Sequence, residues 1–374
     1  MKDEHKRLLK IILISLSSLA VMTLISNYFF YRYFFALGQE SLIPDYPEES
    51  EDETINGDSP GENLYREDEF SRNIVNIMLL GIDRSSDRQR EGREVYFPDT
   101  VKIVSLDLKE DRVRLISVLR DTYTYLPDAN VYDKLANAYV YAYKDDNTVS
   151  PHQQGVQALK EALRHFLGGV PIHYHLTVDM DGAARLVDAL GGVEYELEEP
   201  LRDDFGTGKV VVPEGRRYLD GEEFLYLLRY RGQKGDAWRV EQQQTILKKA
   251  LEQMQENNSF AEIPRIYSIL RRSVDTDLST GQIGFLAWYG AELDPDRLDI
   301  YTFESEKVVS ERNDREVLYA VPDEEHRVEI IQEVFNREEV VPRIGYWPPA
   351  SRPLDGEDRL LDYPSPVLLE EALP

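Results

Sequence analysis

The chain has 374 residues, enough for one large domain or two small ones, and 42% of them are hydrophobic, which is sufficient for a sizeable core. Its formal net charge of −27 argues against a general affinity for nucleic acid, because the phosphates would be repelled. The chain has no cysteine, which excludes disulfides, thiol catalysis and zinc sites built from cysteine.

The N-terminus has the pattern of a membrane anchor. Residues 11–31 carry no charge, and a run of about 20 such residues spans a bilayer as a helix. Residues 1–10 hold Lys2, Lys6, Arg7 and Lys10, which favours a cytoplasmic N-terminus, and aromatic residues between 28 and 35 follow at the far end. A cleaved signal peptide is the alternative, but the apolar run is too long and no small-x-small cleavage site follows it. We therefore expect a single-pass protein whose remaining chain is extracytoplasmic.

Two polar segments flank the central part of the chain. Residues 32–69 are acidic and rich in Pro and Gly, without an apolar period, which predicts a solvated linker. Residues 338–374 form a Pro-rich acidic tail. The globular domain is therefore expected between residues 70 and 337.

Three strands are predicted at the start of this domain. Residues 73–83 read as a buried strand, and residues 100–108 and 112–119 alternate apolar and polar side chains around a turn at residues 109–111. Further strands are expected at residues 172–179, 208–215 and 297–303. Helical periods, Pro starts and Gly stops predict helices at 133–143, 151–167, 181–192, 220–231, 236–257, 262–272, 280–292 and 323–336. This alternation favours an α/β layered sheet.

Charged side chains stand at the ends of the first three strands. Asp83 and Arg84 follow the first strand, Asp99 precedes the second, and Arg120 and Asp121 follow the third. Any one of them could be an ordinary turn residue. Because strands joined by a hairpin are antiparallel, however, the start of the second and the end of the third meet at one sheet edge. We therefore expect Asp99 close to Arg120, and Asp83 beside them if the first strand runs in the matching direction.

A second basic site lies at residues 227–244, "LLRYRGQKGDAWRVEQQQ". Arg229 and Arg231 would point about 200° apart on one helix, so they can converge on a ligand only if the helix ends there, as Gly232 suggests. Arg239 and Gln243 are four residues apart and share a helix face. Ordinary surface cations on a helix-turn-helix are the alternative interpretation.

Arginine pairs match phosphate oxygens, and carboxylates can hold Mg²⁺, so the two sites together indicate phosphoryl or pyrophosphoryl chemistry. Other candidates are weaker. Residues 206–209, "GTGK", lack the spacing of a nucleotide-binding loop, and no Gly-x-Ser-x-Gly motif supports a serine hydrolase. His173 and His175 share a strand face but have no third ligand nearby in sequence, which favours structural roles.

Six segments resemble the LytR-CpsA-Psr family in their order along the chain. They are "NIVNIMLLGIDRS", "FPDTVKIVSLDLKEDRVRLISVLRDTYTYLP", "DKLANAYVYAY", "GVPIHYHLTVDMDGAARLVDALGGVEYEL", "YLDGEEFLYLLRYR" and "GDAWRVEQQQTILKKAL". The resemblance covers roughly residues 73–257, and more loosely extends to about 337. No single segment is specific, but six in order behind one apolar N-terminal run are strong support.

The resemblance implies a membrane-anchored extracytoplasmic ligase with an α/β/α sandwich around a mixed central sheet. Such a ligase moves a glycopolymer, such as teichoic acid or capsular polysaccharide, from a polyprenyl diphosphate carrier to peptidoglycan and forms a phosphodiester. Matching motifs make Asp83 and Asp99 the Mg²⁺-associated acids, with Asp121 a further candidate proton acceptor. The diphosphate-binding residues expected are Arg84, Arg120, Arg229, Arg231, Arg239 and Gln243.

The sequence departs from the family at two positions. Phe97 and Gln242 stand where the family usually has arginine, and Arg90 or Arg93 is a hypothetical replacement for the lost charge. Two other functions therefore stay open: a regulatory envelope protein that binds polyprenyl diphosphate lipids without turnover, and a lipid pyrophosphatase.

Overall fold

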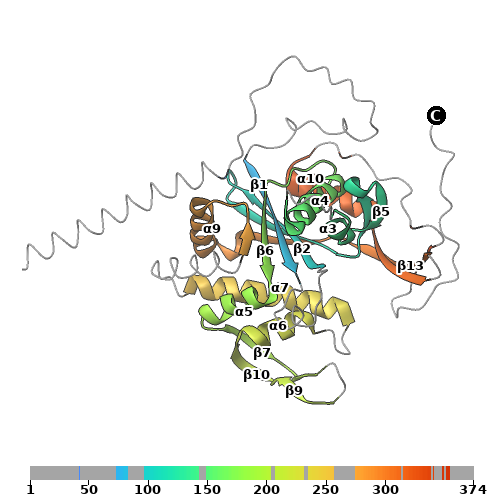
Figure 1. Cartoon of the computed structure of the whole chain (residues 1–374). Helices are drawn as coiled ribbons and strands as arrows, with labels where there is room; N and C mark the ends of the chain where they lie inside the picture. The colour runs from blue at the N-terminus through green and yellow to red at the C-terminus, as the bar shows by residue number, and fades with distance from the viewer. Residues whose placement is uncertain are drawn as a thin grey trace, which may run out of the picture.

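The computed structural model describes residues 42, 73–82, 97–142, 149–203, 207–230, 235–256, 274–312, 315–337, 340, 348 and 351–353 (Figure 1). The predicted transmembrane helix at 11–31 and the helix expected at 262–272 lie outside these ranges. Within them, no helix has both the length and the hydropathy required to cross a membrane.

A central sheet of six strands organises the domain. Its spatial order is β11 (Val274–Thr276), β6 (Tyr174–Asp179), β1 (Ile74–Ile82), β2 (Pro98–Asp107), β3 (Arg112–Val118) and β12 (Leu298–Thr302). The pairs β1–β2, β2–β3 and β6–β11 are antiparallel, whereas β1–β6 and β3–β12 are parallel. The predicted mixed sheet and the hairpin between the second and third strands are therefore confirmed.

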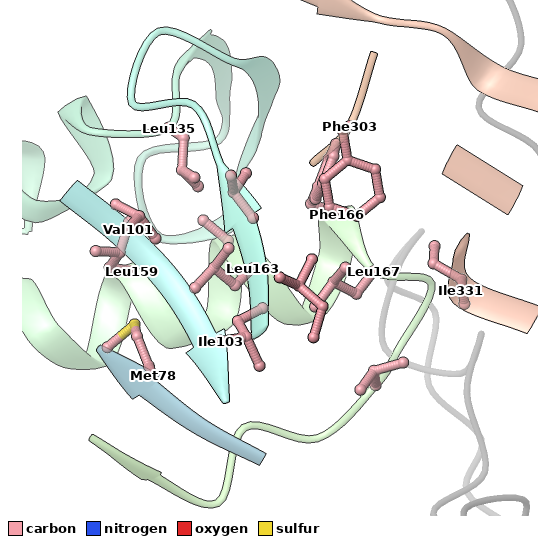
Figure 2. Packing of buried hydrophobic residues seen from close by; sticks show 14 of the residues in the cluster. Met78, Val101, Ile103, Leu135, Leu159, Leu163, Phe166, Leu167, Phe303 and Ile331 are labelled. Carbon is pink, nitrogen blue, oxygen red and sulfur yellow. The ribbon is translucent and has the colours of Figure 1, made fainter. Parts of the chain in front are cut away.

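Helices cover both faces of this sheet, because side chains alternate along each strand. One face packs against α3 (Asn137–Tyr141), α4 (Pro151–Phe166) and α10 (Glu324–Phe335). Figure 2 shows part of this core, where Met78 and Ile103 of the sheet lie near Leu159 and Leu163 of α4. Leu159 and Leu163 are fully buried, and each contributes roughly 1.5–3 kcal/mol relative to exposure. The other face packs Val75 and Ile77 in a cluster with α9 (Thr280–Glu292).

A smaller lobe with its own core lies beside the sheet, at the bottom of Figure 1. It contains α5 (Met180–Ala189), β7 (Val193–Leu197), β8 (Leu201–Arg202), β9 (Val210–Val212), β10 (Gly215–Leu219), α6 (Gly221–Arg229) and α7 (Gly235–Glu256). Asp220 caps α6 in a capping box with Glu223, at the start of the helix expected at 220–231. Helix α7 joins the lobe to the sheet, because Ile246 packs in the lobe core and Leu251 against the second face of the sheet.

The chain between β3 and α4 differs from the prediction. The helix expected at 133–143 begins only at Asn137, and residues 131–134 form β5 (Val131–Lys134) instead. This strand pairs with β4 (Tyr123–Leu126) across a turn of 3-10 helix, η2 (Pro127–Ala129), which ends at Asn130 in the left-handed region with φ of 51°. The helix prediction at 133–134 is therefore wrong, because tertiary pairing overrides local propensity.

A second sheet near the C-terminus was not predicted. The strands β13 (Ser305–Arg312) and β14 (Arg315–Pro322) form an antiparallel pair, and β15 (Ser351–Pro353), from the Pro-rich tail, adds to β13. The short 3-10 helix η3 (Pro295–Arg297) leads into β12. Thr122 bridges to Ala320 of β14, so this second sheet lies against the chain that follows β3.

Candidate functional site

Four strand ends meet at one edge of the central sheet. Ile82, the last residue of β1, pairs with Pro98 at the start of β2 and with Asp179 at the end of β6. Val118, the last residue of β3, pairs with Val101. β1 and β3 therefore run in the same direction and end at the same edge. The sequence predicted a group of charged residues at this edge.

Asp99 and Arg120 form an ion pair across the β2–β3 hairpin, which confirms their predicted proximity. Nη1 of Arg120 donates to Oδ1 of Asp99, and the two side chains are 41% and 29% exposed. Burial alone would lower the pKa of Arg120, but the carboxylates of Asp99 and Asp121 raise it. The guanidinium is therefore permanently charged and accessible from solvent.

The charges continue to a lysine that the sequence analysis missed. Nε of Arg120 lies 3.6 Å from Oδ2 of Asp121, and Nζ of Lys134 donates to Oδ1 of Asp121 at 2.7 Å. Lys134 also lies over the ring of Tyr319, 5.8 Å from its centroid. The result is a chain of alternating charges, Asp99–Arg120–Asp121–Lys134, which we call the charge chain. The turn residues "PDAN" at 127–130 were the available signal that Lys134 lies on a returning strand.

Backbone hydrogen bonds hold the charge chain in place. The carbonyl of Arg120 accepts from the N–H of Ala136 at 3.0 Å, and the carbonyl of Asp121 accepts from the N–H of Ala320 at 2.9 Å. Next to Lys134, the carboxylate of Asp133 is 2% exposed and accepts from the hydroxyls of Tyr141 and Tyr319 at 2.7 and 3.2 Å. The part of the charge chain from Arg120 to Lys134 is therefore held by the chain that follows β5 and by β14 of the second sheet.

The basic stretch lies in the smaller lobe. Arg229 is the last residue of α6, because Tyr230 has an extended backbone; the helix thus ends two residues before the end predicted from Gly232. Nε of Arg229 donates to the carbonyl of Leu225 at 3.1 Å, and Nε2 of Gln243 donates to the carbonyl of Leu228 at 2.8 Å. Gln243 therefore ties α7 to the last turn of α6.

The described residues include only part of the predicted site. Asp83, Arg84, Arg231 and the side chain of Arg239 lie outside them, as do Arg90 and Arg93. Among the residues that are described, no hydrogen bond or ion pair joins Arg229 or Gln243 to Arg120. At the two positions that depart from the family pattern, Phe97 is 43% exposed and Gln242 accepts a hydrogen bond from the hydroxyl of Tyr195.

Asp99 is the only one of the two expected Mg²⁺ ligands that lies within the described residues. Hard divalent cations prefer carboxylate oxygens, and Asp99 keeps Oδ2 beside the Oδ1 atom that contacts Arg120. Asp179, at the same edge, has a structural role, because its Oδ1 accepts from the N–H of Gly182 at 2.6 Å and caps α5.

His173 also has a structural role. Burial lowers its pKa to about 4, and its Nδ1 accepts from the N–H of Asn76 at 2.8 Å, so the ring is neutral.

Comparisons with known proteins agree with this architecture. A model described as the LytR_cpsA_psr family matches residues 46–334. An uncharacterized protein of Staphylococcus aureus is 27% identical over 219 residues, which are 57% of this chain and 50% of that protein. A polyisoprenyl-teichoic acid–peptidoglycan teichoic acid transferase, TagU of Oceanobacillus iheyensis, is 29% identical over 222 residues, which are 59% of this chain and 62% of that protein. The match thus spans between half and two thirds of these relatives' own length.

Solved structures share the fold at low sequence identity. The crystal structure of Bacillus subtilis TagV has a TM-score of 0.57 at 21% identity and covers 71% of this chain and 99% of its own. A structure of TagT bound to LIIa-WTA has a TM-score of 0.52 at 22% identity and covers 71% of this chain and 91% of its own. These likenesses show a common mixed α/β fold around a central sheet.

Proposed function

This chain belongs to the LytR_cpsA_psr family, whose model covers most of it, and on that premise we propose that it transfers a glycopolymer from a polyprenyl diphosphate carrier to peptidoglycan. The observation that carries the proposal is the charge chain at the sheet edge. It presents two fixed cations, Arg120 and Lys134, at a place where side chains from several strands converge. Cations that are positioned in advance are what phosphoryl transfer requires from a protein.

In the proposed reaction, Arg120 and Lys134 bind the diphosphate oxygens. A hydroxyl of peptidoglycan forms a new O–P bond to the phosphorus next to the glycan, and the bond between that phosphorus and the bridging oxygen breaks. Polyprenyl phosphate leaves with the electron pair, and the hydroxyl proton passes to a carboxylate among Asp83, Asp99 and Asp121. The product is a phosphodiester. The two cations stabilise the charge that builds up on the leaving phosphate.

Asp99, together with Asp83, would hold Mg²⁺, and the ion would supply additional positive charge to the diphosphate oxygens. Arg84, Arg229, Arg231 and Arg239 would add further cations to the same anion, with Gln243 beside them. The tie from Gln243 to the carbonyl of Leu228 supports this role, because it fixes the helix end that carries Arg229.

The proposed location is extracytoplasmic, with residues 11–31 as the membrane anchor. The uncharged run and the four preceding basic residues support this orientation. A lipid-linked substrate also requires an enzyme that remains at the membrane. For the polymer itself, two relatives are TagU teichoic acid transferases and TagT was solved bound to LIIa-WTA, which supports teichoic acid as the first substrate to test.

A binding or regulatory role is the second candidate. It is favoured by the two departures from the family pattern, since exposed Phe97 and hydrogen-bonded Gln242 bring no charge to positions where the family usually has arginine. Lipid diphosphate would then bind without turnover.

One assay separates these functions. The full chain is incubated with a synthetic polyprenyl-diphosphate-linked glycan, Mg²⁺ and a peptidoglycan oligomer, and the products are analysed by mass spectrometry. Glycan joined to the oligomer through one phosphate supports the transferase. Free phosphorylated glycan indicates a pyrophosphatase, and binding without any product indicates the regulatory role.

A further inference from the structure

Two histidines and an aspartate from distant parts of the chain converge at the far end of the sheet. His152 lies in the first turn of α4, His175 in β6 and Asp275 in β11. Oδ1 of Asp275 lies 3.0 Å from Nε2 of His152 and 3.4 Å from Nε2 of His175. One ligand atom from each of the three residues lies within 4.8 Å of the other two. We call this group the His–Asp cluster.

The His–Asp cluster is separate from the charge chain. In β6, His175 pairs with Met78, whereas Asp179 pairs with Ile82 at the edge where the charge chain lies. Four residues of strand separate the two ends, a distance of about 13 Å. A ligand of the cluster would therefore not be a ligand of the proposed diphosphate site.

The surroundings of both rings orient Nε2 toward Asp275. Nδ1 of His152 lies 2.7 Å from the hydroxyl of Tyr139, and Nδ1 of His175 lies 3.1 Å from Oδ2 of Asp277. A hydroxyl or carboxylate behind the ring is the usual support of a metal-binding histidine, because it keeps the proton on the rear nitrogen. In the tautomer that carries the proton on Nδ1 of both rings, two Nε2 lone pairs and one carboxylate oxygen converge on one point, and this arrangement attracts a cation.

The ring of His175 is held inside the protein. The residue is 8% exposed, and the carboxylate of Asp277 lies behind its Nδ1 atom. The cluster is still open to ions, since the side chain of Asp275 is 61% exposed and that of His152 is 23% exposed. The sequence favoured a structural role for His175 only because no third ligand was close in sequence, and Asp275 supplies one from 100 residues away.

We propose that the His–Asp cluster binds one Zn²⁺ ion through Nε2 of His152, Nε2 of His175 and a carboxylate oxygen of Asp275. Zinc bonds of about 2.0–2.2 Å in a tetrahedron place the ligand atoms about 3.3 Å apart, and the observed separations of 3.0 and 3.4 Å are close to this spacing. Imidazole nitrogens suit Zn²⁺ far better than Mg²⁺. The fourth position, toward the exposed side of Asp275, is left for water.

Such an ion would stabilise the attachment of β11 to the sheet. β11 is an edge strand of three residues that pairs with β6, and α4 packs against one face of the same sheet. One ion bound by all three elements would hold them together, and its binding free energy would add to the stability of the fold. The role is structural and does not depend on the proposed transferase activity.

The test measures Zn²⁺ binding by calorimetry, and thermal unfolding, on the full chain after EDTA treatment and dialysis. We expect one saturable Zn²⁺ per chain and a higher Tm with Zn²⁺ than with Mg²⁺. The variants His152→Gln and Asp275→Asn change partly exposed side chains and should fold, yet each should weaken Zn²⁺ binding at least about tenfold. His326→Gln is the matched control, because its ring accepts a hydrogen bond from Glu304 N–H elsewhere on the molecule and should leave Zn²⁺ binding unchanged.

Absence of saturable binding would overturn the proposal. Equal Zn²⁺ affinity in the parent chain, His152→Gln and Asp275→Asn would also overturn it, because the ion would then bind elsewhere. A zinc-dependent rise in Tm that persists in both variants would also overturn the proposal, because it would show that the ion binds elsewhere.

Discussion

Asp99, near the start of β2, and Arg120, just after the end of β3, form an ion pair at one edge of the central sheet. The pair has a close counterpart at the opposite edge, where Arg112, at the start of β3, donates to Asp299 at 2.6 Å. The arginine side chains are 41% and 43% exposed, and both aspartates are 29% exposed. Two ion pairs of similar exposure at the two ends of β3 thus allow site effects to be separated from stability effects.

We predict that Asp99→Asn changes binding and transfer in opposite directions. Loss of the carboxylate frees Arg120 for the ligand, so diphosphate binding without Mg²⁺ should tighten several-fold. Transfer with Mg²⁺ should fall, because a carboxylate oxygen for the ion is lost. Titration with a short-chain polyprenyl diphosphate measures the first effect. Asp299→Asn should change neither quantity, and weaker binding by Asp99→Asn in the absence of Mg²⁺ would contradict the proposed competition.

Lys134→Met should lower transfer by about tenfold or more. One charge-assisted hydrogen bond contributes about 1.5–3 kcal/mol, and about 1.4 kcal/mol corresponds to a factor of ten in rate. Lys134→Arg should recover part of the rate. Lys249→Met, which removes a lysine paired with Glu252 on α7, is the control and should keep the parent rate. A parent-like transfer rate for Lys134→Met would contradict the assignment of this lysine to the diphosphate site.

Gln243→Ala should weaken lipid diphosphate binding, because Gln243 fixes the end of α6, which carries Arg229. The lost hydrogen bond to Leu228 costs about 1 kcal/mol of stability. Gln253→Ala is the control, because Gln253 of the same helix donates to the carbonyl of Gly192 at 2.7 Å and accepts from the N–H of Glu194 at 3.0 Å. Both variants should lose stability in urea titrations, Gln253→Ala the more of the two, but only Gln243→Ala should lose affinity. Equal affinity in the two would show that Gln243 acts only on the fold.

Gly155→Ala should destabilise the domain although alanine is the better helix former. A Cβ atom there would lie 2.7 Å from the carbonyl oxygen of Tyr139 and 2.6 Å from its ring, so α3 and α4 would have to separate. Overpacking of this kind costs about 1–3 kcal/mol. Gly290→Ala in α9 meets nothing within 4 Å and should stabilise by about 0.5–1 kcal/mol. Urea unfolding of both variants checks the opposite signs.

Local patterns predicted the part of the site that one hairpin determines. The turn at residues 109–111 fixes the register of β2 against β3, so the proximity of Asp99 and Arg120 followed from alternation and strand direction alone. The start of α6 was also predicted from local sequence, because Asp220 is a residue type that is favoured at a helix N-cap.

Contacts over long sequence distances could not be predicted in this way. Residues 133–134 precede an Ala- and Tyr-rich stretch that favours a helix, but Asp133 is held by Tyr319, which lies 186 residues further along the chain. Lys134 therefore reaches Asp121 from a strand that local propensity did not predict. The same reason explains why the sequence around His175 did not indicate His152 and Asp275 as its neighbours.

The rate of glycan transfer in the matched pair Arg120→Ala and Arg112→Ala tests the central claim most directly. Both variants lose an arginine of similar exposure, one at the start of β3 and one just beyond its end, and both should remain folded, since exposed ion pairs contribute little stability. We predict that Arg120→Ala lowers the initial rate by about a hundredfold or more, as expected for loss of a charge that stabilises the transition state, while Arg112→Ala stays within about twofold of the parent. Parent-like transfer by Arg120→Ala, or an equal loss in both variants, would contradict the assignment of this sheet edge as the diphosphate site.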